Sequence, residues 1–255
     1  MDFIEFHKWV YKEFHIDLNA YKSEQLNRRI TSLMSRVGIE TLEEYKKLLI
    51  QKEEEKQRFL DFITINVTEF FRNPELFKDL EKTLKEYIVK SNKIKVWSAA
   101  CSIGCEPYSL AIILNEINQR GSNSIIATDI DRTILKRAKD GEYALSEMKN
   151  IKDEYIKKYF INIIEDKFRV DNKLKSMISF KQHDLILDKY EKDFDLIICR
   201  NVIIYFKNEV KKDIFKKFSE SLKKDGLLFV GATESIYNYK EYGLEKVSTF
   251  IYKKI

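Results

Sequence analysis

Two patterns of apolar residues follow one another along the chain. Over roughly the first 60 residues, apolar side chains recur at helical spacing, as Phe3, Phe6 and Val10 do, which predicts amphipathic helices. From about Lys93, short apolar runs alternate with helical segments. Such alternation is typical of a mostly parallel sheet with helices on both faces. We therefore predict an all-α N-terminal domain over residues 1–75 and an α/β domain over residues 76–255.

The apolar runs also predict the strands. Between the main runs lies a different segment, at about 160–182, where Phe168 and Phe180 belong to short strand candidates around a charged turn. This segment is predicted to be a small β insertion, and 244–252 a final antiparallel strand. The predicted strands of the main sheet are 94–100, 124–130, 194–201 and 226–233.

Composition narrows the class of protein. With 255 residues and 44% hydrophobic content the chain can bury a full core, and no apolar stretch approaches the roughly 20 residues that span a bilayer. The N-terminus lacks a signal-peptide pattern, so we expect a cytoplasmic protein. Three cysteines predict neither a disulfide framework nor a zinc site, and no metal is expected. A net charge of +5 on 46 basic and 41 acidic residues does not indicate nucleic-acid binding.

The most informative stretch runs from Lys95 to Ser109, where an apolar run ends in small residues, Gly104 and a helix start with Pro107. Strand, tight turn and helix N-terminus together predict a nucleotide-type pocket. One glycine does not make a dinucleotide fingerprint or a phosphate loop. A nucleoside without phosphates, such as the adenosine of S-adenosylmethionine, fits better. Glu106 is a candidate for the ammonium or a ribose hydroxyl of such a ligand, or it stabilises the helix N-terminus.

Further polar residues follow the predicted strands. Asp129 ends a strand about 25 residues after the turn, where a ribose-binding carboxylate is expected, although it is an equally good N-cap for the next helix. Asp184, Arg200 and Asn201 follow other apolar runs. Because ligands of open α/β sheets bind at the carboxyl ends of the strands, these side chains are predicted to line one crevice.

A basic stripe, defined here as Lys22, Arg29 and Arg36, recurs every seven residues along the predicted helix 20–37. Leu26, Ile30, Leu33 and Val37 lie on one face of that helix, and the stripe runs along the flank of this face. The stripe is either an ordinary solvated face or a docking surface for an acidic partner.

Five motifs in order give the chain a family resemblance. They are Asn-Val-Thr-Glu-Phe-Phe-Arg-Asn at 66–73, the glycine turn at 97–109, Ala-Thr-Asp-Ile-Asp at 127–131, Cys-Arg-Asn-Val-Ile-Ile-Tyr-Phe at 199–206 and Gly-Ala-Thr-Glu-Ser at 231–235. Together they resemble the chemotaxis receptor methyltransferases, the CheR family. The resemblance implies a Rossmann-like class I methyltransferase domain with a small β-subdomain insertion, preceded by an all-α domain. It also implies methyl transfer from S-adenosylmethionine to receptor glutamates, giving methyl esters and S-adenosylhomocysteine.

The resemblance also implies roles for individual residues. Two departures are visible: Cys105 stands where the family usually has Glu, and Asp184 where it usually has Asn. Because Glu106 is kept and Asp184 still accepts hydrogen bonds, we expect cofactor binding to survive. Arg200, Asn201 and Tyr205 are implied at the methyl-transfer end. The implied cofactor contacts are Asn66, Thr68, Arg72, Glu106, Asp129, Asp184, Leu185, Arg200 and Asn201.

The chemistry needs no general base, because a glutamate carboxylate with a pKa near 4.3 is already ionised at neutral pH. We therefore expect Arg72 or Arg200 to orient the substrate carboxylate and Tyr205 to help fix the reacting geometry.

The resemblance further implies a partner, the helical cytoplasmic region of chemoreceptors, docking on the basic stripe. Some members also tether to a receptor pentapeptide through a glycine-containing loop of the β-subdomain. Residues 162–167 contain no glycine, so we expect a pentapeptide-independent enzyme, acting as a monomer. The alternative is a cofactor-binding sensor or scaffold without methyl transfer, for which Cys105 is the only support. A small-molecule methyltransferase is disfavoured by the helical domain and its stripe.

Overall fold

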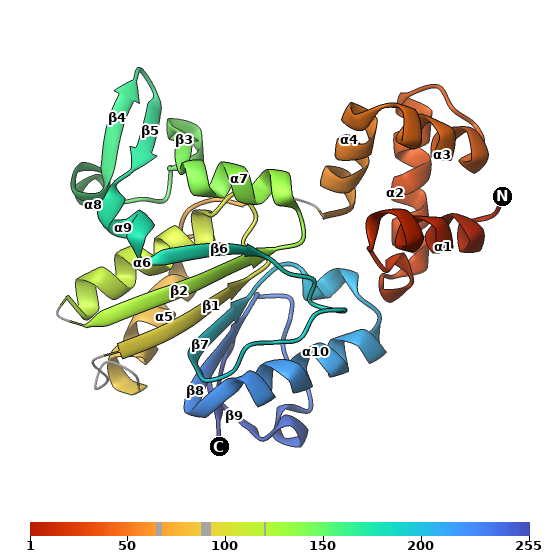
Figure 1. Cartoon of the computed structure of the whole chain (residues 1–255). Coiled ribbons are helices and arrows are strands. Elements are labelled where there is room, and N and C mark those ends of the chain that lie inside the picture. The colour runs from red at the N-terminus through yellow and green to blue at the C-terminus, as the bar shows by residue number, and fades with distance from the viewer. Residues whose placement is uncertain (65–67, 88–92, 120) are drawn as a thin grey trace. The chain divides into compact units, whose positions relative to one another are not determined.

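The computed structural model describes residues 1–64, 68–87, 93–119 and 121–255. They form two compact units (Figure 1). The first unit comprises Met1–Asn66 and Tyr205–Lys212, and the second comprises Val67–Ile204 and Asp213–Ile255. The division therefore falls earlier than the expected boundary at residue 75, because Phe70 is buried in the core of the second unit.

The first unit is all-helical up to Thr64, as predicted. Its helices are α1 (Phe3–Phe14), α2 (Ser23–Arg36), α3 (Leu42–Gln51) and α4 (Glu53–Thr64), with a short turn η1 (Leu18–Ala20) after α1. Phe6, Tyr45 and Phe59 form its aromatic core, and none of the three is more than 1% exposed. Asp2 caps α1 by accepting from the Glu5 N–H, which fixes where the chain enters this unit.

A late segment of the chain completes the first unit. The N–H of Lys22 donates to the carbonyl of Tyr205 at 2.9 Å, and the N–H of Lys207 donates to the carbonyl of Ala20 at 2.9 Å. Between them Tyr21 and Phe206 form an antiparallel bridge, with ring centroids 4.9 Å apart. The sequence pattern did not predict this pairing.

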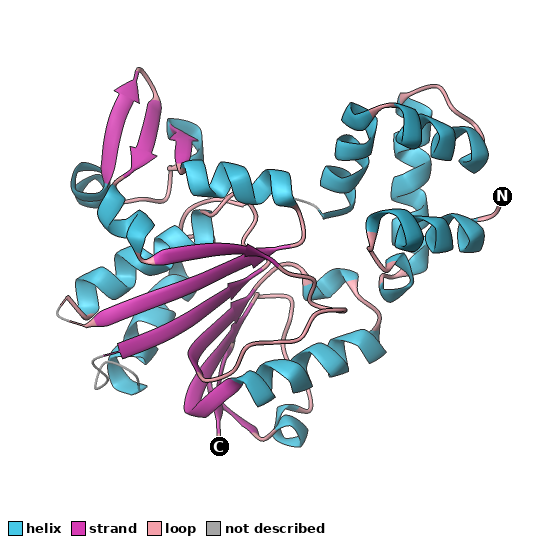
Figure 2. Cartoon of the chain, viewed as in Figure 1, coloured by secondary structure: helices cyan, strands magenta, loops and turns pink. Residues whose placement is uncertain are grey.

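The second unit is built on a seven-stranded sheet in the order β6-β2-β1-β7-β8-β10-β9 (Figure 2). The first five strands are parallel, and β10 runs antiparallel to both neighbours. The prediction of a mostly parallel sheet with an antiparallel end is confirmed, but the single strand predicted at 244–252 is in fact two strands, β9 and β10, which pair with each other. The strands are β1 (Lys93–Ala99), β2 (Ser122–Asp129), β6 (Ile178–Gln182), β7 (Phe194–Cys199), β8 (Leu222–Val230), β9 (Leu244–Ser248) and β10 (Ile251–Lys254).

Helices cover both faces of this sheet (Figure 1). On one face Phe229 of β8 packs edge-on against Phe77 of α5, with centroids 6.2 Å apart. From the other face Trp97 of β1 packs against Phe218 of α10, with centroids 5.4 Å apart. Because side chains alternate between the two faces along each strand, the sheet contributes to an apolar layer on either face. The helices are α5 (Pro74–Tyr87), α6 (Cys105–Ile117), α7 (Arg132–Asp140) and α10 (Asn208–Ser221).

A separate three-stranded sheet has the order β3-β5-β4, from β3 (Glu142–Ala144), β5 (Lys167–Val170) and β4 (Phe160–Ile164). It confirms a small β insertion but corrects its extent. Residues 178–182, predicted to belong to the insertion, form β6 of the main sheet, where Ile178 pairs with Ile125. A short apolar run predicts a strand but not the sheet that the strand joins. The short helices α8 (Asp153–Tyr159) and α9 (Asn172–Ser176) flank β4 and β5 in the chain.

Within the residues described, no helix has both the length and the apolar character that crossing a membrane requires.

Candidate active site

The glycine turn lies between β1 and α6. Three of its residues have positive φ, namely Ala100 (63°), Ser102 (50°) and Gly104 (93°). A Cβ on Gly104 would lie 3.0 Å from the hydroxyl of Tyr143, which donates a 2.6 Å hydrogen bond to the carbonyl of Ile103. Both the backbone conformation and the close neighbour require glycine here. The turn is thereby held tightly against the small β-sheet, with the N-terminus of α6 following at once.

Asp129 ends β2 beside this turn. Its carboxylate accepts from the N–H of Ser102 at 2.8 Å and from the N–H of Asp131 at 3.2 Å. Asp131, and not Asp129, caps the next helix, because its side chain accepts from the N–H groups of Thr133 and Ile134 at the start of α7. A carboxylate has about four acceptor positions, so Asp129 retains capacity for ribose hydroxyls. Burial raises the pKa of Asp129 to about 6.

Glu106 begins α6 and lies among polar groups. Ser98 donates to its Oε1 at 2.8 Å, and a guanidinium nitrogen of Arg200 lies 3.7 Å from its Oε2. Burial raises the pKa of Glu106, and the charge of Arg200 opposes that shift. Cys105, the departure from the family pattern, is fully buried. Burial also raises the pKa of the Cys105 thiol, so it is an inert core residue and not a nucleophile.

Arg200 carries a buried charge, with its side chain only 2% exposed. Its guanidinium donates to the carbonyl of Arg72 and to Oδ1 of Asn73, each at 2.9 Å. The rings of Phe77 and Phe229 flank it, at 5.3 and 5.1 Å from the guanidinium carbon. Arg200 therefore fastens the segment that carries Arg72, and this contact was not foreseen from the sequence.

The segment that holds Arg72 is anchored on both sides. Phe70 is fully buried and packs edge-on against Tyr143. The N–H of Phe71 donates to Oγ of Ser109 in α6 at 2.9 Å. Arg72 and Thr68 are half-buried. The predicted contact residue Asn66 lies outside the described residues.

Asp184 and Leu185, two of the predicted cofactor contacts, follow β6 in the chain. Oδ1 of Asp184 accepts from the N–H of Ile186 at 2.7 Å, whereas its Oδ2 is buried with no hydrogen-bond partner in the protein. Leu185 is 7% exposed. A buried acceptor without a donor fits an exocyclic amino group of a base. Together with the carboxylate beside the glycine turn, this set of acceptors fits the adenosine of S-adenosylmethionine.

Asn201 follows Arg200 with φ of 61°, in the left-handed region. Its N–H donates to the buried carboxylate of Glu234 at 2.6 Å. The side chain of Asn201 is half-buried, and its cofactor contact stays a prediction. Glu234 was quoted within a motif but given no role by the sequence argument.

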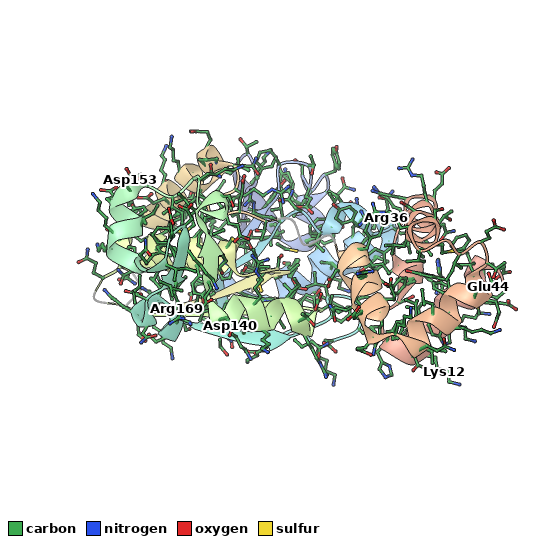
Figure 3. All side chains as sticks on the ribbon, turned by 90° about the horizontal axis from the view of Figure 1, so that it is seen from above. Lys12, Arg36, Glu44, Asp140, Asp153 and Arg169 are labelled. Atoms are coloured by element: carbon green, nitrogen blue, oxygen red, sulfur yellow. The ribbon has the colours of Figure 1, made fainter. Side chains whose placement is uncertain are left out.

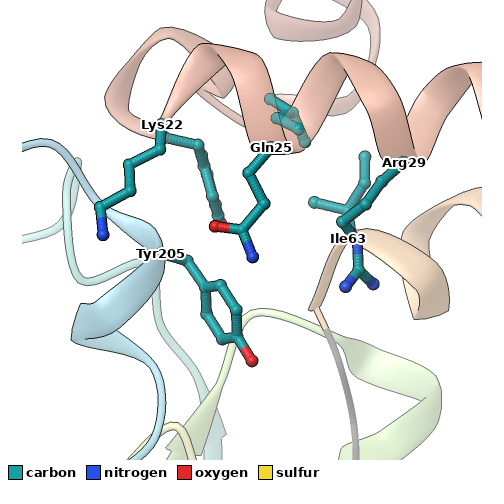
Figure 4. Close-up of a pocket in the computed structure, with 7 residues that line it drawn as sticks. Lys22, Gln25, Arg29, Ile63 and Tyr205 are labelled. Carbon is teal, nitrogen blue, oxygen red and sulfur yellow. The ribbon is translucent and has the colours of Figure 1, made fainter. Parts of the chain in front are cut away.

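Tyr205 belongs to the first unit, where it lines a small hollow on α2 (Figure 4). Lys22, Gln25 and Arg29 line the same hollow, so two members of the basic stripe meet the predicted catalytic tyrosine. Gln25 lies three residues after Lys22 and four before Arg29, which places all three on one face of a helix. This spacing could have identified Gln25 as a member of the site from the sequence. The grouping of Tyr205 with Arg72 and Arg200 stays a prediction.

The arginines of the basic stripe also pack against α4. The guanidinium of Arg29 lies 4.4 Å from the ring centroid of Phe62 and donates to the Phe62 carbonyl. Exposed Arg36 (Figure 3) lies 5.1 Å from the same ring and lines a second hollow of about 420 Å³ with Leu33 and Arg58. The stripe is therefore not simply solvated, since it borders hollows that both apolar and charged side chains line.

An open sheet of this order, with a glycine turn after its first strand and a carboxylate at the end of the next, defines an S-adenosylmethionine-dependent methyltransferase of class I. Residues 66–251 match the family model "CheR methyltransferase, SAM binding domain", and residues 1–64 match "CheR methyltransferase, all-alpha domain". The chain belongs to the CheR family of chemotaxis methyltransferases.

Named relatives agree with the family models. The chain is 39% identical to a chemotaxis protein methyltransferase of Listeria monocytogenes over 255 residues, covering 99% of this chain and 97% of that one. It is 36% identical to a protein of the same name in Borreliella burgdorferi, covering 97% and 92%. For the Escherichia coli chemotaxis protein methyltransferase the identity is 32%, covering 89% and 81%. The chain is therefore an S-adenosylmethionine-dependent methyltransferase that acts in chemotaxis.

Proposed function

We propose that this enzyme methylates glutamate side chains of chemoreceptors, forming methyl esters. The observation that carries the proposal is the hollow on α2, where Lys22, Gln25 and Arg29 meet Tyr205 (Figure 4). Two cations, an amide and a phenol suit a carboxylate because every one of them can donate a hydrogen bond to it. A small apolar substrate would leave these donors unpaired.

The residues assigned to catalysis need only to bind and orient. Bound S-adenosylmethionine supplies an electrophilic methyl group, and the substrate carboxylate is already ionised at neutral pH. Arg72 would orient that carboxylate, and Tyr205 would donate to it. Arg200, being buried and bonded to the Arg72 carbonyl, suits positioning better than substrate contact. Alignment of this kind is worth about 7 to 11 kcal/mol when the geometry is right.

The basic stripe would dock the acidic helices of the receptor's cytoplasmic region. Lys22 and Arg36 are exposed, and the second hollow beside Arg36 offers apolar contacts to a helix lying along α2. Opposite charges would steer this encounter and weaken with salt. The proposal places the enzyme in the cytoplasm, as a monomer.

Independence from the receptor pentapeptide is part of the proposal. Strands β4 and β5 are joined by a tight turn, since Ile164 pairs with Lys167 and only Glu165 and Asp166 lie between them. Asp166, with φ of 58°, takes the left-handed position without a glycine. No inserted loop is present there to hold a peptide. Calorimetry with a receptor-tail pentapeptide should therefore show no binding, and a micromolar Kd would refute this part.

The experiment that tests the function uses tritiated S-adenosylmethionine and receptor-containing membranes, followed by alkaline release of volatile counts. Base-labile label on the receptor identifies a carboxyl ester, whereas stable label would mean another acceptor atom. Label transfer should fall sharply in Arg72→Ala, and unchanged turnover there would remove Arg72 from the site. Cofactor binding without any transfer would favour the sensor or scaffold alternative.

A further inference from the structure

Glu234 is a buried carboxylate that receives an unusual number of backbone donors. Its Oε1 accepts from the N–H groups of Val202 and Ile203 at 2.9 and 2.8 Å, and of Ile204 at 3.3 Å. Its Oε2 accepts from Asn201 at 2.6 Å and from Gly231 at 3.0 Å. The residue is only 5% exposed. Five donors from two separate segments thus converge on one side chain.

Backbone donors compensate this charge. No Lys or Arg lies within 4 Å of the Glu234 carboxylate among the residues described. Burial raises the pKa of Glu234, while the hydrogen bonds from Asn201 and Gly231 oppose the shift. Successive N–H groups that point at one anion form a binding concavity of the kind that proteins use for phosphates. Here the chain fills that concavity with its own carboxylate.

The chain is shaped to bring this carboxylate into place. The N–H of Glu234 donates to the carbonyl of Gly231 at 2.9 Å, closing a tight turn after β8. A Cβ on Gly231 would lie 2.3 Å from Oε2 of Glu234 and 3.2 Å from the nitrogen of Asn201. Only glycine therefore leaves room for the carboxylate at this position.

We infer that Glu234 is a positioning residue for cofactor binding, which locks the turn Asn201–Ile204 so that Asn201 is held ready for the cofactor. The left-handed backbone of Asn201 is one that asparagine tolerates, so holding the residue in this conformation alone requires a constraint from its neighbours. The Glu234 carboxylate binds the N–H of Asn201 and of the next three residues, so it supplies that constraint. The inference rests on the predicted contact of Asn201, and it is independent of the receptor substrate.

The test is calorimetric titration of the full chain with S-adenosylhomocysteine. In Glu234→Gln the charge is lost and an amide NH₂ faces backbone donors, so the Kd should rise at least ten-fold. In steady-state assays the KM for S-adenosylmethionine should rise in parallel, while kcat at saturating cofactor stays within about three-fold. The matched control is Glu241→Gln, an exposed glutamate in the same connection, which should bind as the native protein does.

Gly231→Ala provides the second route, because its methyl group displaces the carboxylate without removing the charge. Its Kd should rise as well, and the double variant with Glu234→Gln should bind no more weakly than Glu234→Gln alone. A folded Glu234→Gln or Gly231→Ala protein with a Kd within two-fold of native would overturn the inference. Should neither variant fold, hydrogen exchange of the native protein decides. Slow exchange of the Asn201–Ile204 amides without cofactor supports the lock, and fast exchange refutes it.

Discussion

Replacing Arg200 by Met tests whether this arginine is a structural anchor or a substrate contact. The change removes a guanidinium whose side chain is 2% exposed and leaves Glu106 buried without its cation. It also leaves the carbonyl of Arg72 and Oδ1 of Asn73 without their 2.9 Å donors. Breaking a buried pair by removing one partner costs about 3 to 5 kcal/mol. That is a large share of the roughly 5 to 15 kcal/mol that stabilises a typical domain.

The chain's two tryptophans allow the second unit to be followed alone. Trp97 is 2% exposed in the core of that unit, and Trp9 lies in α1 of the first unit. In a Trp9→Phe background, fluorescence therefore reports unfolding around Trp97. With a urea slope of about 2 kcal/mol/M, a loss of 3 kcal/mol lowers the midpoint by about 1.5 M.

A double variant separates the causes. If the uncompensated charge of Glu106 dominates, adding Glu106→Gln to Arg200→Met should recover much of the lost stability, since no buried charge is then left alone. A midpoint shift below about 0.5 M in Arg200→Met would refute the anchoring role. Arg200 would then be available for the substrate contact suggested by the family resemblance.

Three further predictions concern the cofactor and the partner. Because burial raises the pKa of Asp129 to about 6, its carboxylate is ionised at pH 7.5 and mostly protonated at pH 5. S-adenosylhomocysteine should therefore bind more weakly as the pH falls through 6. A pH profile of binding as flat as that of Asp129→Asn would contradict the ribose contact. Lys22→Glu should raise the KM for receptor membranes about ten-fold at low salt and leave the cofactor Kd unchanged. The control is Arg28→Glu, which changes an exposed arginine of α2 and should alter the KM little. Equal effects of both variants would mean that overall charge, and not the basic stripe, attracts the receptor. In Gly104→Ala the new residue must adopt φ of 93° with its Cβ 3.0 Å from the Tyr143 hydroxyl. The free energy of unfolding should fall by about 2 kcal/mol and the melting midpoint by about 4 to 8 °C. An unchanged midpoint would show that the turn relaxes.

Periodicity was enough to predict the N-terminal helices and the main strands, but not every short element or all of the strand partners. The helix expected after Asp129 starts at Arg132, because Asp131 caps it and the apolar spacing continues to the glycine that ends it. The strand at Ile178 was predicted, yet its place beside Ile125 in the main sheet was not. Strand pairing depends on contacts between residues far apart in the chain, which local patterns do not encode.

The candidate site shows the same division. Asp129 and Glu106 were identified from their places after a strand and a glycine, and the structure brings both to the edge of the glycine turn. The anchoring of Arg72 by Arg200, and of Asn201 by Glu234, was missed. These contacts join segments distant in sequence through backbone groups, whose direction no residue type reveals.

The bridge between Tyr21 and Phe206 has a consequence for how the chain is made. The helices of the first unit leave the ribosome early, but the segment Tyr205–Lys212 that pairs with Ala20 and Lys22 follows roughly 150 residues later. At about 5 to 20 residues per second, the unit waits about 7 to 30 s for its last part. Until then the N–H of Lys22 and the carbonyl of Ala20 lack the partners that this segment supplies. Completion of the N-terminal unit is thus delayed until most of the chain has been synthesised.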